Sequence, residues 1–407
     1  MNPEPIPVLI VDDDPVFSRF VRQLVESLGD ELRCAPTWVD SAEKAFKAIE
    51  RDHYELALLD YHMPGASGLD LLKGIQRLPL PEQPAVIMLT ASGNEAVAVE
   101  AMKSGAKDYL TKADIDVPPL MRAIKNALSQ KRLAEQVAAY NAQVNADLEM
   151  ARKLQESLLP QRYPSFPRTA TPARSALRFY HRYFWTTRLG GDFFNVQDLS
   201  DTKAGVLICD VMGHGVRAAL VTAMLRALVG DLAAEAGNPG TFLAEMNHRL
   251  TAILKQIGEP LYATAFYLIA DIEAGHLRYA SAGQPRPLHV QRRAGVVAPL
   301  RVPTSAGAAL GLFADARYLT CECELAPEDL VLLFTDGLIE VTGNQDEEYG
   351  QERLLAAARQ RIQLPLARLV DELIEDARRF SGDHEFSDDV CLLGMEAAGG
   401  RVDAHTT

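Results

Sequence analysis

Cysteine and tryptophan are scarce in this sequence of 407 residues. Of the five cysteines, only Cys321 and Cys323 lie close together, with one residue between them, whereas zinc sites use pairs with about two to four intervening residues. Disulfide-stapled secreted domains need far more cysteine. We therefore expect structural cysteines in a reducing cytosol, and we interpret both tryptophans, Trp38 and Trp185, as packing residues.

Long apolar runs and an excess of positive charge are also missing. No segment reaches the roughly 18 apolar residues that a membrane span needs, and the N-terminus lacks the basic start and apolar stretch of a signal peptide. The net charge of −14 at pH 7 repels nucleic acid backbones and anionic membranes. We expect a cytoplasmic protein that binds neither nucleic acid nor membrane.

The length exceeds the size at which one hydrophobic core usually stops growing, so we expect more than one domain. Over residues 1–130, short unbroken apolar runs at 8–11, 56–59 and 85–89 alternate with segments of helical period. Such runs are typical of a parallel sheet that helices cover on both faces. We predict a doubly wound α/β domain there.

Polar residues with distinct chemistry follow the predicted strands. Asp12 and Asp13 follow the first strand, Asp60 and Thr90 end two others, and Lys112 follows a fourth. Because the carboxyl ends of parallel strands meet at one edge, we expect these side chains to share a pocket. Clustered carboxylates suit Mg²⁺, and an acceptor carboxylate beside a hydroxyl and an ammonium group can form an aspartyl phosphate. We assign Asp60 as the nucleophile.

These residues and the segment LLDYHMPGASGLDLL resemble a response-regulator receiver domain. The resemblance implies a flavodoxin-like fold with a parallel sheet of five strands, and a sensor histidine kinase or phosphotransfer protein as phosphoryl donor. It also implies that Asp13, Asp60 and the carbonyl of His62 bind Mg²⁺, with Asp12 in support.

The resemblance further implies that Thr90 and Lys112 contact the phosphoryl group, and that Thr90 and Tyr109 form the pair that moves on phosphorylation. One position departs from the family. Ala113 follows Lys112, where the family usually has a proline. The geometry of this loop is therefore open at the level of the sequence.

Residues 131–160 form a predicted helical linker. From residue 133 to 158 there is neither proline nor glycine, and apolar residues recur at alternating spacings of four and three, with Asp147 as the one polar interruption. The seam consists of Leu133, Val137, Tyr140, Val144, Ala151, Leu154 and Leu158. It fits either a parallel homodimer through a coiled coil or a single amphipathic helix packed on its own chain.

Residues 161–396 have a different pattern, with longer alternating strands and two long helical segments, which predicts stacked sheets flanked by helices. Residues 397–407 form a predicted flexible tail. Acidic residues punctuate this half in four motifs: LGGDFF (Asp192), ICDVMGHG (Asp210), LFTDGLIE (Asp336) and FSDDVCLL (Asp388, Asp389). Carboxylates beside buried strands are costly unless they are paired or bind metal, so these indicate a site for two Mg²⁺ or Mn²⁺ ions that bind a phosphate and activate water.

Over roughly residues 150–396, these motifs and the segment ARKLQESLLP resemble the SpoIIE-like branch of the PPM, or type-2C, protein phosphatases. The resemblance implies an α-β-β-α sandwich and a metal-dependent serine/threonine phosphatase that acts on small phosphorylated regulators such as anti-sigma-factor antagonists. It also implies that Asp389 supports the metal ligands from behind.

By the same resemblance, Asp210 bridges the two metal ions, Asp192 and the carbonyl of Val211 bind one of them, and Asp336 with Asp388 binds the other. We expect phosphorylation of the N-terminal domain to regulate this activity, with either sign.

Two rival functions remain for the C-terminal half. The letters GGDFF resemble the GGDEF signature of diguanylate cyclases, but a cyclase would not explain the three acidic motifs downstream. A non-catalytic adaptor that binds a sigma factor or its regulator is the alternative to the phosphatase. A degenerate site should have lost one of the four principal acids, and all four are present.

Overall fold

The computed structural model describes residues 4–29, 32–91, 95–256, 261–303, 307–382 and 386–398. The chain divides into two compact units, residues 1–145 and 146–407, and each is described here by itself. Of the predicted tail, residues 399–407 lie outside the described residues. No helix in the described ranges combines the length and apolar character that crossing a bilayer demands.

The N-terminal unit contains a sheet with the strand order β2-β1-β3-β4-β5, in which all neighbours are parallel. The strands are β1 (Ile6–Val11), β2 (Cys34–Val39), β3 (Leu56–Asp60), β4 (Ala85–Thr90) and β5 (Asp108–Thr111). The unbroken apolar runs form β1, β3 and β4, and β3 and β4 are buried throughout because helices cover both faces. This confirms the predicted doubly wound fold.

Helices pack on both faces of this sheet. They are α1 (Pro15–Glu26), α2 (Ala42–Arg51), α3 (Gly68–Ile75), the short η2 (Leu80–Glu82), α4 (Glu95–Lys103) and the first part of α5 (Val117–Leu158). Helices α1 and α5 pack on one face, and α2, α3 and α4 on the other. The side chain of Asp14 caps α1 by accepting hydrogen bonds from the backbone N–H groups of Val16 and Phe17, so the helix begins directly behind the predicted metal ligands.

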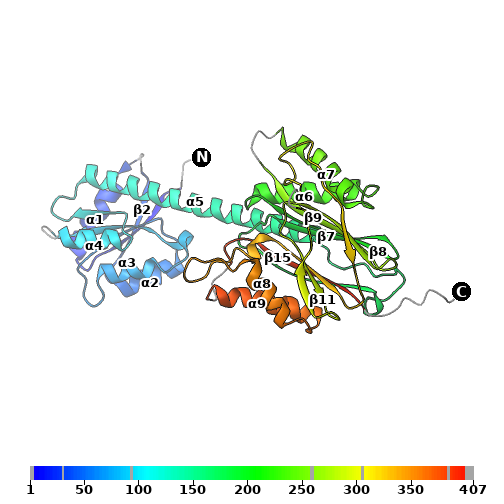
Figure 1. Cartoon of the computed structure of the whole chain (residues 1–407). Coiled ribbons are helices and arrows are strands. Elements are labelled where there is room, and N and C mark those ends of the chain that lie inside the picture. The colour runs from blue at the N-terminus through cyan, green and yellow to red at the C-terminus, as the bar shows by residue number, and fades with distance from the viewer. Residues whose placement is uncertain are drawn as a thin grey trace. The chain divides into compact units, whose positions relative to one another are not determined.

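Helix α5 continues past the boundary between the two units (Figure 1). With no proline or glycine after residue 119, nothing in its sequence interrupts the helical hydrogen bonds. Much of the predicted seam is exposed: the exposed fraction is 62% for Leu133, 51% for Val137, 69% for Tyr140 and 62% for Leu154. These side chains are not covered by the chain itself.

The C-terminal unit has two antiparallel sheets, with the orders β13-β10-β9-β8-β7 and β12-β11-β14-β15-β6. The strands are β6 (Leu177–Phe184), β7 (Asp192–Ser200), β8 (Lys203–Val211), β9 (Ala263–Asp271), β10 (His276–Ala282), β11 (Leu288–Gln291), β12 (Val296–Pro299), β13 (Cys321–Glu324), β14 (Leu330–Phe334) and β15 (Val390–Ala397). The helical segments are η3 (Pro172–Arg174), α6 (Val216–Asp231), α7 (Pro239–Leu254), η4 (Asp336–Leu338), α8 (Gly350–Gln360) and α9 (Leu366–Phe380).

Helices cover the outer faces of both sheets. Helices α6 and α7 pack on the sheet that contains β7 to β10, and α8 and α9 pack on the sheet that contains β6 and β15 (Figure 1). Buried apolar side chains of β14 and β15 join the core beneath the first sheet, so the two sheets face one another. This arrangement confirms the predicted α-β-β-α sandwich.

Candidate functional site

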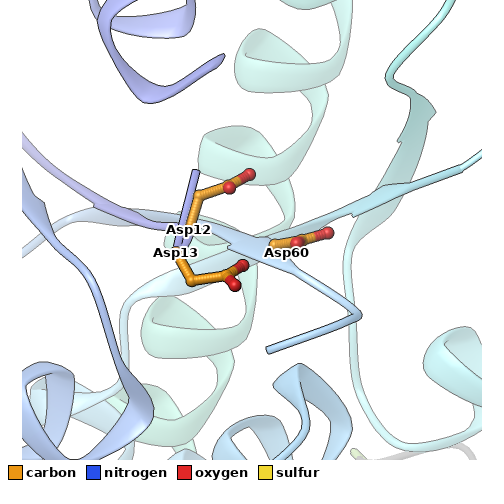
Figure 2. Close-up of side chains that lie close together, drawn as sticks. All are labelled: Asp12, Asp13 and Asp60. Carbon is orange, nitrogen blue, oxygen red and sulfur yellow. The ribbon is translucent and has the colours of Figure 1, made fainter. Parts of the chain in front are cut away.

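Three carboxylates cluster at the carboxyl edge of the N-terminal sheet. Asp12 and Asp13 directly follow β1 and Asp60 ends β3, and an oxygen from each lies within 4.8 Å of the others (Figure 2). Asp12 and Asp60 are buried, whereas Asp13 is exposed. In the part of the chain that the structure describes, this is the only group of acidic, histidine or cysteine ligands that meets so closely. Its oxygen donors fit Mg²⁺.

Lys112 reaches into this cluster. Its Nζ lies 2.7 Å from Oδ2 of Asp12 and 2.9 Å from Oδ2 of Asp60, and it also lies 4.5 Å from the ring centroid of Phe17. Burial lowers the pKa of Lys112, but its hydrogen bonds with the two carboxylates outweigh burial and raise it. Lys112 therefore takes the expected place although Ala113, and not proline, follows it.

The buried position of Asp60 weakens its acidity. Burial raises the pKa of Asp60, the hydrogen bond from Lys112 opposes the rise, and the charge of Asp12 adds to it. The backbone around it is also tightly packed, because a Cβ atom at Gly68 would lie 2.0 Å from the carbonyl oxygen of Asp60. Only glycine lets α3 begin so close to the acceptor strand.

The remaining predicted receiver residues lie on β4, on β5 and in the loop after β3. Thr90 is buried at the end of β4, and its carbonyl accepts a hydrogen bond of 2.8 Å from the N–H of Lys112. Tyr109 lies on β5 and is 44% exposed, and His62 lies in the loop after Asp60. The contacts thus bring together Asp12, Asp13, Asp60 and Lys112, whereas the roles of Thr90, Tyr109 and the His62 carbonyl stay predictions.

The first pair of acids in the C-terminal unit lies at the end of one sheet. Asp192 and Asp210 are paired residues in the antiparallel register of β7 and β8. The N–H of Val211 donates to the carbonyl of Gly191, at 3.2 Å, and a Cβ atom at Gly191 would lie 2.6 Å from the carbonyl oxygen of Val211. The glycine therefore allows the strands to bring Asp192, Asp210 and the Val211 carbonyl together.

The second group of acids comes from the facing sheet. Asp336 begins η4 directly after β14, and Asp388 and Asp389 directly precede β15. A Cβ atom at Gly337 would lie 2.0 Å from the carbonyl oxygen of Asp389, so this close approach also needs glycine. Both sheets deliver their acids to the same end of the sandwich, since Asp210 interacts electrostatically with Asp336 and Asp388.

Asp389 binds the backbone rather than standing free. Its Oδ1 accepts hydrogen bonds from the N–H and Oγ1 of Thr186, at 2.9 and 3.2 Å, and its Oδ2 accepts one from the N–H of Gly191, at 2.8 Å. Burial raises the pKa of Asp389, and these hydrogen bonds oppose the rise. The geometry is that of a residue that holds the segment before Asp192.

The electrostatics of this cluster favour a bound cation. Burial raises the pKa of Asp192 well above its usual range, and the charge of Asp210 adds to this. Burial also raises the pKa of Asp210 to about 8, with the charge of Asp336 as the next cause. Divalent cations among these oxygens would let the carboxylates ionise at neutral pH, so the donor set fits Mg²⁺ or Mn²⁺.

Sequence reasoning missed the residues that hold Asp192. Oγ1 of Thr335 donates to Oδ2 of Asp192, at 2.7 Å, and accepts from the N–H of Cys391, at 2.9 Å. The hydroxyl of Tyr183 donates to the carbonyl of Asp192, at 3.0 Å. Thr335 directly precedes Asp336 in the motif LFTDGLIE, which was the available signal. Nothing in the local sequence marks Tyr183.

Two protein families match separate parts of the chain. The response regulator receiver domain matches residues 8–125, and the family described as Stage II sporulation protein E (SpoIIE) matches residues 200–398. The chain joins a receiver domain to a SpoIIE-type domain. The chain thus contains both domains that the motifs predict.

Two curated relatives are each similar to one part of this chain. The phosphoserine phosphatase RsbP of Bacillus subtilis is 25% identical over 248 residues, which are 61% of this chain and 57% of RsbP. The response regulator protein FleR of Pseudomonas aeruginosa is 42% identical over 108 residues, which are 26% of this chain and 21% of FleR. The chain therefore spans less than two thirds of either relative.

The C-terminal fold also has a counterpart among solved structures. The SiaA-PP2C domain of Pseudomonas aeruginosa aligns with 64% of this chain and 99% of its own length, with a TM-score of 0.55 and 23% identity. At this level of identity the likeness concerns the fold. It confirms that the SpoIIE-type domain has the PP2C architecture.

Proposed function

We propose that this protein is a two-component response regulator in which phosphorylation of Asp60 controls a Mg²⁺- or Mn²⁺-dependent protein-serine/threonine phosphatase. The observation that carries the proposal is the convergence of Asp192, Asp210, Asp336 and Asp388 from two sheets on one end of the sandwich. Burial raises the pKa of Asp192 and of Asp210 there, and the charges of neighbouring acids add to the rise. The similarity to RsbP, a phosphoserine phosphatase, supports the same activity.

In this proposal Asp210 would be shared by two metal ions. Asp192 and the carbonyl of Val211 would hold one ion, and Asp336 and Asp388 would hold the other. When bound, such a pair of ions orients a phosphate and lowers the pKa of a water molecule that attacks phosphorus. The protein itself keeps Asp192 and Asp389 in place through hydrogen bonds with Thr335, Thr186 and Gly191. Because water is the proposed nucleophile, no side-chain nucleophile is required.

The receiver site performs a different step. In this proposal Asp13, Asp60 and the carbonyl of His62 bind Mg²⁺ with the support of Asp12, and a sensor histidine kinase or phosphotransfer protein supplies the phosphoryl group. Lys112, already 2.9 Å from Asp60, balances the negative charge of the phosphoryl oxygens, and the hydroxyl of Thr90 is the other contact. Thr90 and Tyr109 then form the moving pair.

The proposed substrate is a small phosphorylated regulator of the anti-sigma-factor-antagonist type, which the phosphatase dephosphorylates in a partner-switching pathway. We also propose a parallel homodimer through α5, because Leu133, Val137, Tyr140 and Leu154 are each more than half exposed. Leu133 and Val137 line a groove that a second copy of α5 can fill. Sedimentation velocity of the full chain measures this dimer directly.

The deciding experiment is an assay of Mn²⁺-dependent hydrolysis of p-nitrophenyl phosphate and of a phosphoserine protein by the full chain. Activity should need the metal and fall by more than about 10³-fold in Asp210→Ala and in Asp336→Ala, since both remove a ligand of the reacting centre. Asp60→Asn, with and without acetyl phosphate, measures regulation. If the chain hydrolyses neither substrate in any state, including with a phosphorylated receiver, the result would favour the alternative function of a non-catalytic adaptor.

A further inference from the structure

Helix α5 ends against the backbone that precedes Asp192. The amide nitrogen of Gln155 donates to the carbonyl of Gly190, at 2.7 Å, and to Oγ1 of Thr222 on α6, at 3.2 Å. Its amide oxygen accepts from the N–H of Gly190, at 3.1 Å. Gln155 is buried, with 7% of its surface exposed, so both backbone groups of Gly190 are bound by one side chain.

Two further residues of α5 contact the same segment. The guanidinium of Arg152 lies 5.0 Å from the ring centroid of Trp185, and Glu149 lies 3.8 Å from Arg188. These residues and Gln155 are spaced three apart, so they share one side of the helix. The Arg188–Glu149 pair is largely exposed and contributes little, whereas Gln155 makes buried hydrogen bonds.

The segment held by Gln155 has little room to move. A Cβ atom at Gly190 would lie 2.5 Å from the hydroxyl of Tyr183 and 2.6 Å from Oδ2 of Asp389. The next residue, Gly191, donates its N–H to the same Oδ2 atom, at 2.8 Å. Gln155 and Asp389 thus bind the two polar groups of the peptide between Gly190 and Gly191: Gln155 donates to its carbonyl, and Asp389 accepts from its N–H.

Gly190 is connected to both proposed ligands of one metal ion. Asp192 follows two residues later, and the carbonyl of Gly191 accepts the hydrogen bond from Val211. A shift of Gly190 therefore displaces the carboxylate of Asp192 and the carbonyl of Val211 together. Hydrogen bonds that hold metal ligands in place commonly change the affinity of a site for its metal ion.

We propose that Gln155 is a positioning residue through which helix α5 sets the metal-binding geometry of Asp192 and Val211; the inference rests on the proposed phosphatase function. Leu154 of the exposed seam is adjacent to Gln155 in the sequence, about 100° around the helix. A rotation of α5 that changes the packing of the seam therefore also moves the amide of Gln155. The contact between the linker and the metal site is this amide.

The test uses full-length protein in which Asp13→Asn removes a proposed receiver metal ligand. In this background we compare the parent chain with Gln155→Met, which preserves volume and removes the hydrogen bonds, and with Gln136→Met, the same change at an exposed position of α5. Mn²⁺ binding is measured from the electron paramagnetic resonance signal of the free ion. Amide hydrogen exchange of residues 186–192 is measured in the metal-free chain.

We expect Gln155→Met to weaken Mn²⁺ binding at least tenfold and to speed exchange at residues 186–192, while Gln136→Met matches the parent. Thr222→Val removes one hydrogen-bond acceptor of Gln155 and should give a smaller loss of affinity. At saturating Mn²⁺, the KM of Gln155→Met for p-nitrophenyl phosphate should match that of the parent, because the substrate contacts remain.

Equal Mn²⁺ affinity and equal exchange in Gln155→Met and Gln136→Met would overturn this inference and leave the proposed function standing. A parent chain that binds no Mn²⁺ would overturn both. Should Gln155→Met fail to give folded protein, Thr222→Val alone decides, and an unchanged Mn²⁺ affinity there counts against the inference.

Discussion

The two acidic sites of this chain balance their charge in different ways. At the receiver site, Lys112 bridges Asp12 and Asp60, so an ammonium group is built into the fold. At the site of the C-terminal unit, the charged groups that most affect Asp192 and Asp210 are other carboxylates. The first site can hold its charges without a metal, whereas the second depends on cations or protons.

This difference follows from what each site has to do. In the proposed function a phosphoryl group forms on Asp60 and is later lost, and a fixed cation beside this carboxylate serves both states. A site that binds metal through Asp192 and Asp210 gains affinity from unbalanced negative charge. The cost of that charge is visible in the raised pKa of Asp210, about 8.

Removing the built-in cation should have the largest effect on stability. We expect Lys112→Met to destabilise the receiver unit by about 3 kcal/mol at neutral pH, because Asp12 and Asp60 then face each other without a counter-charge. Mg²⁺ should restore much of the loss. Chemical denaturation with and without Mg²⁺ measures both effects, and an unchanged midpoint would contradict the charge balance described here.

Removing the hydroxyl behind Asp192 should have a smaller effect, on metal binding. Thr335→Val preserves the shape of the side chain but removes the donor to Asp192 and the acceptor for Cys391. We expect a loss of roughly 10- to 100-fold in Mn²⁺ affinity. Thr335→Ser, which keeps the hydroxyl, is the matched control, and equal losses in both variants would refute the role of this hydrogen bond.

The pH dependence of the metal-free chain tests the charge of the second site without any substitution. Because the pKa of Asp210 is raised to about 8, the folded chain binds more protons there than the unfolded chain between about pH 4 and pH 8, so stability falls as pH rises through this range. Four pKa units correspond to about 5 kcal/mol, so we expect the melting temperature of the C-terminal unit to drop by roughly 10 °C. Scanning calorimetry checks this.

Saturating Mn²⁺ should abolish that slope, because bound cations replace the protons. Asp210→Asn removes the titrating group and should flatten the metal-free profile as well. A flat profile in the metal-free parent chain would show that its carboxylates are balanced by some other group.

The receiver could be predicted from the sequence almost completely, because its site is built from strand ends. Each of Asp12, Asp60, Thr90 and Lys112 comes directly after or at the end of an apolar run, and a parallel sheet brings such positions together whatever the details of packing. The acids of the C-terminal unit were recognisable for a similar reason, since glycines mark the close approaches beside Asp192 and Asp336.

The residues that hold the acids were not predictable in this way. Thr335 reaches Asp192 across the two sheets, and Gln155 reaches Gly190 from a helix 35 residues earlier. Their roles depend on how distant segments pack, and a threonine in a strand or a glutamine on a helix is ordinary in isolation. Asp389, which the family resemblance placed behind the ligands, is found bound to Thr186 and Gly191.

The two tryptophans, which the sequence suggested were packing residues, stand one at each site. The indole N–H of Trp38 donates to the carbonyl of Asp12, at 3.0 Å, and Trp185 packs beside Gly190. Each site therefore has its own natural fluorophore. In a Trp185→Phe chain, the fluorescence of Trp38 reports changes at the receiver carboxylates. In a Trp38→Phe chain, the fluorescence of Trp185 reports changes in the segment before Asp192. The rate of change at each site can therefore be measured without an added label.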